Sequence, residues 1–517
     1  MVERMKRKTE ILLICLLCAM AVAVSFIVLF RVTVNGIGLT PDSTIYITAA
    51  KNLLEGNRLY VGATPMTHYP PVYSLLLAGS GLFNKDIQTA ARWLHALLFG
   101  VNAILFMLCI YSGTRRNIVT MAAGGLLYFS SSAVLNAYSY ALSEPPFIFF
   151  TLLAFLLLSI YFGSNKPVHL ILASLTLGLG IGTRYVGIAL LPPLIISLLL
   201  FGQMPLRKKI LTSIWSTALA IIPITAWAIR NVILTRSAAN RVLVFHLIDL
   251  NRIKSMIDTF HNFILPSFEK RWINALEIGL VGLGIVFLLV VLIRNRSTTH
   301  EENRNSRFFI ALGTVFSISY ILVLFLSISF LDAGTSLDER ILLPVFLAMT
   351  IAVFATVDLY AVTLRKPAAV PILLLCVAFI IRINTPVMIK NAERMRSNGI
   401  GFNTVFWNES PTLSEVSDLP TDAKVYSNGF DVMRIKTWRE TLPLPYKYNS
   451  ASTLLNPDYT LELVTMCREV NEGSALIVYL DEVNWREYFA DEKELVEACT
   501  PPLLIDTPDG AIYGIED

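Results

Sequence analysis

The sequence predicts an α-helical polytopic membrane protein of about eleven transmembrane helices, followed by a small C-terminal α/β domain. Of its 517 residues, 55% are hydrophobic and only 15% are charged, whereas a soluble chain carries about 25% charged residues. The apolar residues also fall in blocks of about 20, the length of a helix that crosses a bilayer. Residues 1–383 carry a net charge of +15 and residues 384–517 a net charge of −11. We therefore divide the chain into a transmembrane domain, 1–383, and an acidic soluble domain, 384–517.

The first apolar block, residues 11–30, follows a basic N-terminus. It is longer than the core of a typical signal peptide, and no small-x-small cleavage site follows it, so we interpret it as an uncleaved span. The run 168–202 is too long for one crossing and is interrupted by Arg184 and by Pro192-Pro193, which indicates two spans. The remaining predicted spans are 88–112, 118–135, 145–162, 210–230, 274–293, 308–331, 341–363 and 368–383.

The loops between these spans place basic residues on one side at every turn. With the N-terminus in the cytoplasm, the inside loops carry Arg115, Arg116, Lys166, Arg207, Lys208, Lys209, Arg294, Arg296, Arg304, Arg307, Arg365 and Lys366. The positive-inside rule then predicts a multi-pass cytoplasmic membrane protein with a cytoplasmic N-terminus and an extracytoplasmic C-terminal domain. The same topology brings a set of polar residues to the outer face: Asp42, Glu144, Arg184, Arg230, Asp332, Asp338, Glu339 and Arg340.

The long first outer loop, 31–87, predicts two helices at the membrane surface. Thr40-Pro41-Asp42 is a helix start and Gly56 a stop. The apolar positions 45, 49 and 53 share one face of this helix, which is typical of a helix that lies in the interface. The segment 69–83 is apolar but too short to span, so we expect a second, half-buried helix.

The C-terminal domain predicts strands at 423–427, 475–480, 503–506 and 511–513, and helices at 457–472 and 483–498. Such alternation favours a small α/β domain. Cys467 and Cys499 could pair in an oxidising compartment, and two free buried thiols explain the sequence equally well.

Several kinds of chemistry have no signal in this sequence. It contains no P-loop, no glycine-rich dinucleotide fingerprint, no Asp-x-Asp, no Cys/His zinc cluster and no Gly-x-Ser-x-Gly elbow. Neither a divalent metal nor a nucleic-acid partner is predicted. The sequence instead offers carboxylates and arginines at a lipid interface. A carboxylate can take a proton from an acceptor hydroxyl or amine, and arginine can bind a phosphate and stabilise it as it leaves. These groups suit displacement of a lipid phosphate at an anomeric carbon.

The sequence motifs resemble the GT-C superfamily of integral-membrane glycosyltransferases, in the branch of protein O-mannosyltransferases and lipid A aminoarabinose transferases. The resemblance rests on these segments: Pro41-Asp42…Tyr46…Gly56, His68-Tyr-Pro-Pro-Val-Tyr73, Ala141-Leu-Ser-Glu-Pro-Pro146, Thr183-Arg-Tyr-Val-Gly187, Trp227…Arg230-Asn231, Asp338-Glu-Arg-Ile-Leu-Leu-Pro344 and Val425-Tyr-Ser-Asn-Gly429.

This resemblance implies a GT-C-like fold, a polyprenyl-phosphate-linked sugar as donor substrate, and inversion at the anomeric carbon. Asp42 maps onto the catalytic acidic residue of the first outer loop, although Ser43 stands where many relatives have a second acid. Glu144 is the second catalytic acidic residue that it implies. The implied substrate-binding residues are Arg340 and Arg184 for the phosphate, with His68, Tyr69 and Glu339.

Each of these residues also has a structural interpretation. Asp42 could be a helix N-cap, and Glu144 could favour a helix dipole. Arg340 could pair with Asp338, and Arg184 could mark a loop. Two functional alternatives therefore stay open: a lipid or solute transporter (a flippase, for example), and a catalytically inactive scaffold of envelope assembly. The acceptor could be a protein, a lipid or a glycan, and the oligomeric state is unknown.

Overall fold

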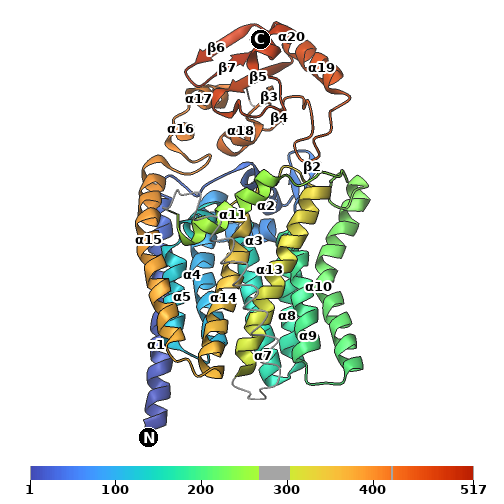
Figure 1. The fold of residues 1–517 in the computed structure, drawn as a ribbon. Helices are drawn as coiled ribbons and strands as arrows, with labels where there is room; N and C mark the ends of the chain where they lie inside the picture. The colour runs from blue at the N-terminus through green and yellow to red at the C-terminus, as the bar shows by residue number, and fades with distance from the viewer. Residues whose placement is uncertain (1, 267–302, 421–422, 516–517) are drawn as a thin grey trace.

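The computed structural model describes residues 2–266, 303–420 and 423–515, and consists of a helical bundle capped at one end by a mixed α/β domain (Figure 1). The N-terminus lies at the opposite end of the bundle from this domain. The helices of the bundle are α1 (Val2–Val32), α4 (Ile87–Gly113), α5 (Ile118–Ser130), α6 (Ser132–Ser139), α7 (Glu144–Ser164), α8 (Pro167–Thr183), η1 (Tyr185–Leu190), α9 (Leu191–Phe201), α10 (Leu206–Thr235), α13 (Arg304–Phe330), α14 (Glu339–Thr363) and α15 (Ala369–Asn398).

These helices confirm a polytopic membrane fold. Within the described part of the chain, seven helices are long and apolar enough to cross a membrane: α1, α4, α7, α10, α13, α14 and α15. The two predicted spans of the run 168–202 correspond to the shorter apolar helices α8 and η1–α9, which are separated at Arg184. The predicted span 274–293 lies outside the described residues. The predicted division at residue 383 falls within α15, which continues to Asn398.

The predicted span 118–135 is not one straight helix. It is broken into α5 and α6, which meet at an angle of 65°. The break occurs because Ser131 adopts an extended backbone conformation, and its Oγ accepts the N–H of Val134 to cap the new helix.

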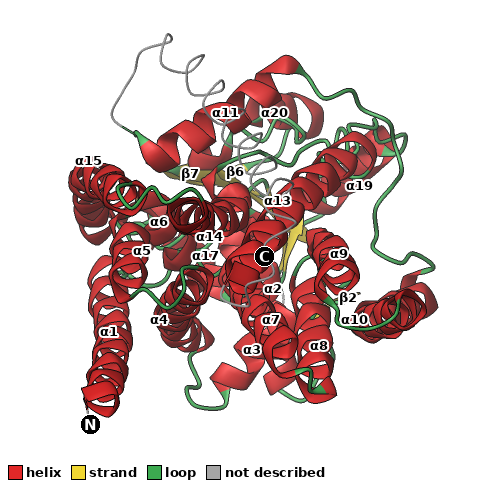
Figure 2. Cartoon of the chain, turned by 60° about the horizontal axis from the view of Figure 1, so that its bottom comes forward, coloured by secondary structure: helices red, strands yellow, loops and turns green. Residues whose placement is uncertain are grey.

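The interior of the bundle is formed by α4, α7, α13 and α14, which are mostly buried, whereas α1, α10 and α15 are mostly exposed. Figure 2 shows α1 and α10 at opposite edges. Small residues allow close helix contacts. A Cβ at Gly313 of α13 would lie 2.5 Å from the carbonyl oxygen of Ala348 of α14, so only glycine permits this approach.

The end of the bundle next to the α/β domain carries the interfacial elements α2 (Pro41–Leu54), β1 (Tyr60–Val61), β2 (Thr64–Pro65), α3 (Val72–Gly81) and α11 (Leu250–Ile264). The two helices predicted in the first outer loop are therefore present as α2 and α3. Thr40 is the N-cap of α2, because its Oγ1 accepts the N–H of Ser43 at 3.3 Å, and Pro41 occupies the first helical position.

The C-terminal domain is built on a five-stranded mixed sheet in the order β4-β3-β5-β7-β6. Strands β3 and β4, and β3 and β5, are parallel, whereas β7 pairs antiparallel with β5 and β6. The elements are α16 (Val405–Asn408), α17 (Pro411–Asp418), β3 (Lys424–Ser427), α18 (Phe430–Thr437), β4 (Thr441–Pro443), α19 (Tyr459–Asn471), β5 (Ala475–Leu480), η4 (Asp481–Val483), α20 (Glu492–Cys499), β6 (Leu503–Thr507) and β7 (Gly510–Tyr513). All four predicted strands are present.

The predicted helix 483–498 is wrong over its first half. Only α20 is helical, because Asp491 accepts the N–H of Glu494 at 2.8 Å and so starts the helix there. The predicted helix 457–472 is present as α19.

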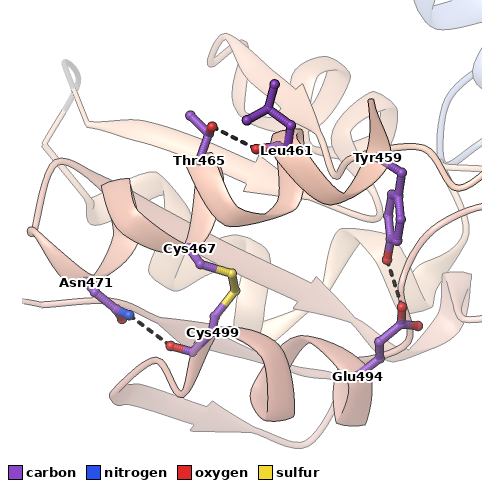
Figure 3. The surroundings of a disulfide bond; sticks show 7 residues. All are labelled: Tyr459, Leu461, Thr465, Cys467, Asn471, Glu494 and Cys499. Atoms are coloured by element: carbon purple, nitrogen blue, oxygen red, sulfur yellow. Dashed lines mark hydrogen bonds between the residues drawn. A yellow bond between two sulfur atoms is a disulfide. The ribbon is translucent and has the colours of Figure 1, made fainter. Parts of the chain in front are cut away.

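A disulfide between Cys467 and Cys499 joins α19 to α20 (Figure 3). Two hydrogen bonds reinforce this junction: Asn471 donates to the carbonyl of Cys499 at 2.9 Å, and Tyr459 donates to Glu494 at 2.8 Å. Of the two alternatives that the sequence left open, the structure therefore contains the paired cysteines.

The C-terminal domain docks on α2. The first outer loop forms parallel bridges at Leu39 with Gly401 and at Gly38 with Tyr140. One apolar cluster is shared by both domains and contains Tyr46, Ile47 and Ala50 of α2 together with Val432, Met433 and Ile435 of α18. Helix α2 therefore lies between the bundle and the sheet domain.

Candidate active site

Helix α2 places Asp42 in its first turn, with the side chain directed at two partners. Because Thr40 is the N-cap of α2, the carboxylate of Asp42 does not cap the helix. Its Oδ1 accepts the hydroxyl of Tyr69 at 2.7 Å, and its Oδ2 accepts Nη1 of Arg340 at 3.2 Å. The side chain is 34% exposed. The carboxylate of Asp42 is thus held in one orientation and is still accessible from outside the protein.

Glu144 begins α7, where the following Pro145 and Pro146 suit the first turn of a helix. Its side chain is only 2% exposed and forms ion pairs with two guanidinium groups. Oε1 lies beside Nη1 of Arg184 and 3.3 Å from Nε of Arg340. A buried carboxylate requires such partners, because transfer of an unpaired charge into a protein interior is strongly unfavourable.

Arg184 stands between α8 and η1 in an extended backbone conformation. In addition to its ion pair with Glu144, it donates from Nη1 to Oγ of Ser143 at 3.2 Å. The hydroxyl of Tyr46 donates to the same oxygen at 3.3 Å. Ser143, which precedes α7, therefore links α2 to the α8–η1 junction.

Arg340 bridges the two carboxylates. It pairs with Asp42 through Nη1 and with Glu144 through Nε. It does not pair with Asp338, which instead caps α14 by accepting the N–H of Ile341 at 3.0 Å. In the described part of the chain no hydrogen bond from Nη2 of Arg340 is found, so this donor is available to a ligand.

Tyr69 and His68 form the wall next to Asp42. Burial and the charge of Asp42 raise the pKa of Tyr69 well above its usual value, so its hydroxyl remains a donor. The His68 ring lies edge-on to Tyr69, with 4.8 Å between centroids. Burial, with the charge of Arg241, lowers the pKa of His68, and its Nε2 lies 3.3 Å from Nη2 of Arg241. Arg241 also donates from Nη1 to Asp332 at 2.8 Å.

Two of the polar residues predicted at the outer face lie apart from this cluster. Glu339 faces α6, where Nδ2 of Asn136 donates to it at 3.5 Å. Arg230 stacks over Trp227 and donates to the carbonyl of Met66 at 2.8 Å, so it holds the first outer loop.

Three residues of this arrangement were not predicted from the sequence: Tyr46, Ser143 and Arg241. The first two lie inside the quoted motifs and could have been found as their polar members. Arg241 lies in a segment without a recognisable motif.

The arrangement therefore contains two carboxylates and two guanidinium groups, contributed by α2, α7, the α8–η1 junction and α14. One carboxylate is partly exposed and one is buried. Among the described residues no group of three or more His, Cys, Asp or Glu side chains could hold a metal ion.

Comparison with known proteins gives one family match. The model of the dolichyl-phosphate-mannose-protein mannosyltransferase family matches residues 54–234. This range includes Glu144 and Arg184 and begins after Asp42. No curated protein sequence matches the chain.

Solved structures match the fold over nearly the whole chain. ArnT from Cupriavidus metallidurans, bound to undecaprenyl phosphate, has a TM-score of 0.60 at 12% identity, with 96% of this chain and 97% of that chain covered. The same protein in the apo state has a TM-score of 0.59 at 12% identity and the same coverage. The arabinofuranosyltransferase AftD from Mycobacteria has a TM-score of 0.53 at 12% identity, covering 97% of this chain and 40% of that chain. The predicted GT-C-like fold and the resemblance to GT-C glycosyltransferases are confirmed.

Proposed function

We propose that this protein is an inverting glycosyltransferase. It transfers a sugar from a polyprenyl-phosphate carrier to a hydroxyl or amine of an acceptor at the outer face of the membrane. The observation that carries this proposal is the cluster of Asp42, Glu144, Arg184 and Arg340, drawn from four segments far apart in the sequence. The fold similarity to ArnT, whose structure contains undecaprenyl phosphate, supports a lipid-linked donor.

In the proposed reaction Asp42 is the general base. Its partly exposed carboxylate takes the proton of the acceptor hydroxyl or amine as the acceptor atom forms its bond to the anomeric carbon. The bond between that carbon and the phosphate oxygen breaks, and its electron pair leaves with the polyprenyl phosphate. The hydrogen bond from Tyr69 fixes which carboxylate oxygen faces the acceptor.

Arg340 and Arg184 stabilise the phosphate that leaves. Nη2 of Arg340, which donates to no described residue, can bind a phosphate oxygen while the other nitrogens stay on the carboxylates. Glu144 acts through these two arginines, because its buried charge keeps both guanidinium groups in position. Fixed charges of this kind lower the barrier because they need no reorganisation during the reaction.

The position of the charged cluster favours an enzyme over a transporter. Transporter sites commonly lie near the middle of the membrane, between repeats. Here Asp42 and Glu144 lie on the first turns of their helices, at the end of the bundle that faces the sheet domain.

A binding experiment tests the donor class. Native mass spectrometry of the purified full-length protein, before and after addition of undecaprenyl phosphate, detects a bound carrier. We expect Arg340→Ala to weaken this binding at least tenfold. Arg396→Ala is the matched control, since Arg396 is an exposed arginine in the last turn of α15. Equal binding by both variants would contradict the proposed role of Arg340.

A transfer assay tests the chemistry. The donor is the carrier-linked sugar whose mass is found in the native mass spectrum, and membrane extract is the source of the acceptor. Asp42→Asn keeps the shape of the side chain but removes the base, so we expect transfer to fall at least a hundredfold. Glu55→Gln, at the end of the same helix, is the control. Full activity of Asp42→Asn and Asp42→Ala would refute the mechanism, and the scaffold alternative would gain support.

A further inference from the structure

The segment between α10 and α11 contains an extended strap, residues 242–248, that runs along the end of α13. The N–H of Val244 donates to the carbonyl of Phe330 at 3.1 Å, and the N–H of His246 donates to the carbonyl of Ser329 at 2.7 Å. The backbone N–H groups of these two residues therefore contact α13. In an extended chain alternate side chains share one face, and Leu243, Phe245 and Leu247 share the face that is exposed.

The outward side chains of the strap are apolar and exposed. Leu243 is 75% exposed, Phe245 62% and Leu247 85%, and the neighbouring Val242 and Leu250 are also mostly exposed. A continuous row of this kind is unusual on a surface that faces water and marks a site of contact with a partner or a membrane.

The strap continues a lipid-facing surface of the bundle. Along the spanning helix α13, Ile318, Leu322, Leu326 and Phe330 are each 40–56% exposed. They recur every four residues, so they form one stripe along the helix. The stripe ends at Phe330, whose ring centroid lies 5.4 Å from that of Phe245. The apolar surface thus passes from α13 to the strap without a break.

The charges that flank the strap match the surface of a bilayer. Arg236 precedes it and Lys254 follows it in α11, and both are exposed; the carboxylate of the exposed Asp249 between them accepts the N–H of Arg252 as the N-cap of α11. Cations beside an apolar face are typical of segments that bind membranes, because the apolar groups enter the acyl region and the cations contact lipid phosphates.

We propose that the strap inserts into the outer membrane leaflet as an in-plane anchor, with Leu243, Phe245 and Leu247 among the acyl chains. This anchor has a consequence for the site. The residue that precedes the strap is Arg241, which contacts both Asp332 and His68 beside the wall of Asp42. The lipid surface therefore helps to hold Arg241 against the site. This inference concerns contact with the membrane and does not depend on the proposed reaction.

Site-directed fluorescence tests the anchor in the full-length protein. The background replaces the exposed or half-exposed Cys15, Cys18 and Cys376 and keeps the disulfide. Leu247→Cys is labelled with nitrobenzoxadiazole and the protein is reconstituted in nanodiscs with and without phosphatidylcholine brominated on its acyl chains. Leu322→Cys on α13 is the lipid-exposed standard.

Leu455→Cys is the matched control, because Leu455 is 81% exposed but belongs to the sheet domain. We expect the probe at 247 to show at least half of the quenching seen at 322, and the probe at 455 to show none. Leu243→Cys gives an independent reading of the same face. Quenching at 247 by aqueous iodide but not by brominated lipid would overturn the proposal. Protection from both quenchers would also overturn it and would indicate that another protein surface covers the strap.

Discussion

Glu144→Gln gives the sharpest test of the charge arrangement at the candidate site. The substitution keeps the shape of the side chain and removes a charge that is almost fully buried between two guanidinium groups. Arg340 would keep its ion pair with Asp42 and is itself 32% exposed, so the substitution destabilises this charge only slightly. Arg184, with a side chain 15% exposed, would retain only the hydrogen bond to Ser143 among the described residues. The loss of folding free energy in Glu144→Gln therefore comes mainly from the unpaired charge of Arg184.

The size of this cost follows from the burial of the pair. Removal of one partner from a buried ion pair costs about 3–5 kcal/mol, and we expect the lower end, about 3 kcal/mol, because Arg184 keeps a neutral acceptor. Arg184→Gln leaves Glu144 paired with Arg340, so we expect this variant to lower the free energy of unfolding by about 2 kcal/mol. The double variant removes both charges, and we expect it to cost about 3 kcal/mol, which gives a coupling energy of about 2 kcal/mol.

The measurement is unfolding of the purified full-length protein in mixed micelles of increasing dodecyl sulfate content, followed by circular dichroism for all four members of the cycle. The exposed pair of Lys493 and Glu497, 3.8 Å apart on α20, provides the control cycle. We expect a coupling below about 0.5 kcal/mol there. If the costs of Glu144→Gln and Arg184→Gln add to within about 0.5 kcal/mol, the two groups do not act as a buried pair and the reasoning fails.

Four further predictions concern the candidate site and the C-terminal domain. Tyr69→Phe removes a hydrogen bond to a charged group, worth about 1.5–3 kcal/mol, so transfer should fall about tenfold to a hundredfold while binding of undecaprenyl phosphate is unchanged; an unaltered rate would exclude an orienting role. Replacement of Cys467 and Cys499 by alanine opens a loop with a sequence separation of 32 and should destabilise the protein by about 4 kcal/mol; six reactive thiols instead of four in the denatured, unreduced wild type would show that no disulfide forms. His68 has a pKa lowered from 6.5, so the unfolded state binds more protons below that pH, and the stability present above pH 6.5 is lost as the pH falls. His68→Gln should flatten this loss between pH 7 and pH 5, and an unchanged slope would contradict the assignment. In the proposed mechanism two arginines carry the phosphate charge, so EDTA should leave transfer unchanged, and a loss that magnesium restores would overturn this expectation.

Much of the fold and part of the candidate site could be predicted because the bilayer restricts what a sequence can do. Apolar blocks of a fixed length indicate the spans, and charged residues near them are costly enough to attract attention. The structure brings Asp42, Glu144, Arg184 and Arg340 together with Tyr69, as the motifs and topology suggested. Their chemical roles stay proposals.

The rest depends on geometry that a linear sequence does not reveal. Glu339 and Arg340 are neighbours in one motif, but successive residues of a helix point about 100° apart, so only Arg340 faces the cluster. The bend at Ser131 depends on a single cap in an otherwise apolar run. Arg241 reaches the site through a long connection whose path is set by backbone contacts with α13.

The position of Asp42 depends on both domains. On one side of α2, Tyr46 packs against Tyr69 and Tyr73 and donates to Ser143, which ties the helix to the bundle. On the other side, the buried residues of α18 share a core cluster with α2, and the hydroxyl of Thr44 donates to the carbonyl of Asp431. That carbonyl belongs to a residue whose own side chain is held by a buried bidentate pair with Arg486. The orientation of Asp42 toward Arg340 therefore requires the packed sheet domain as well as the membrane helices, which explains why a soluble domain far along the chain is structurally continuous with the first outer loop.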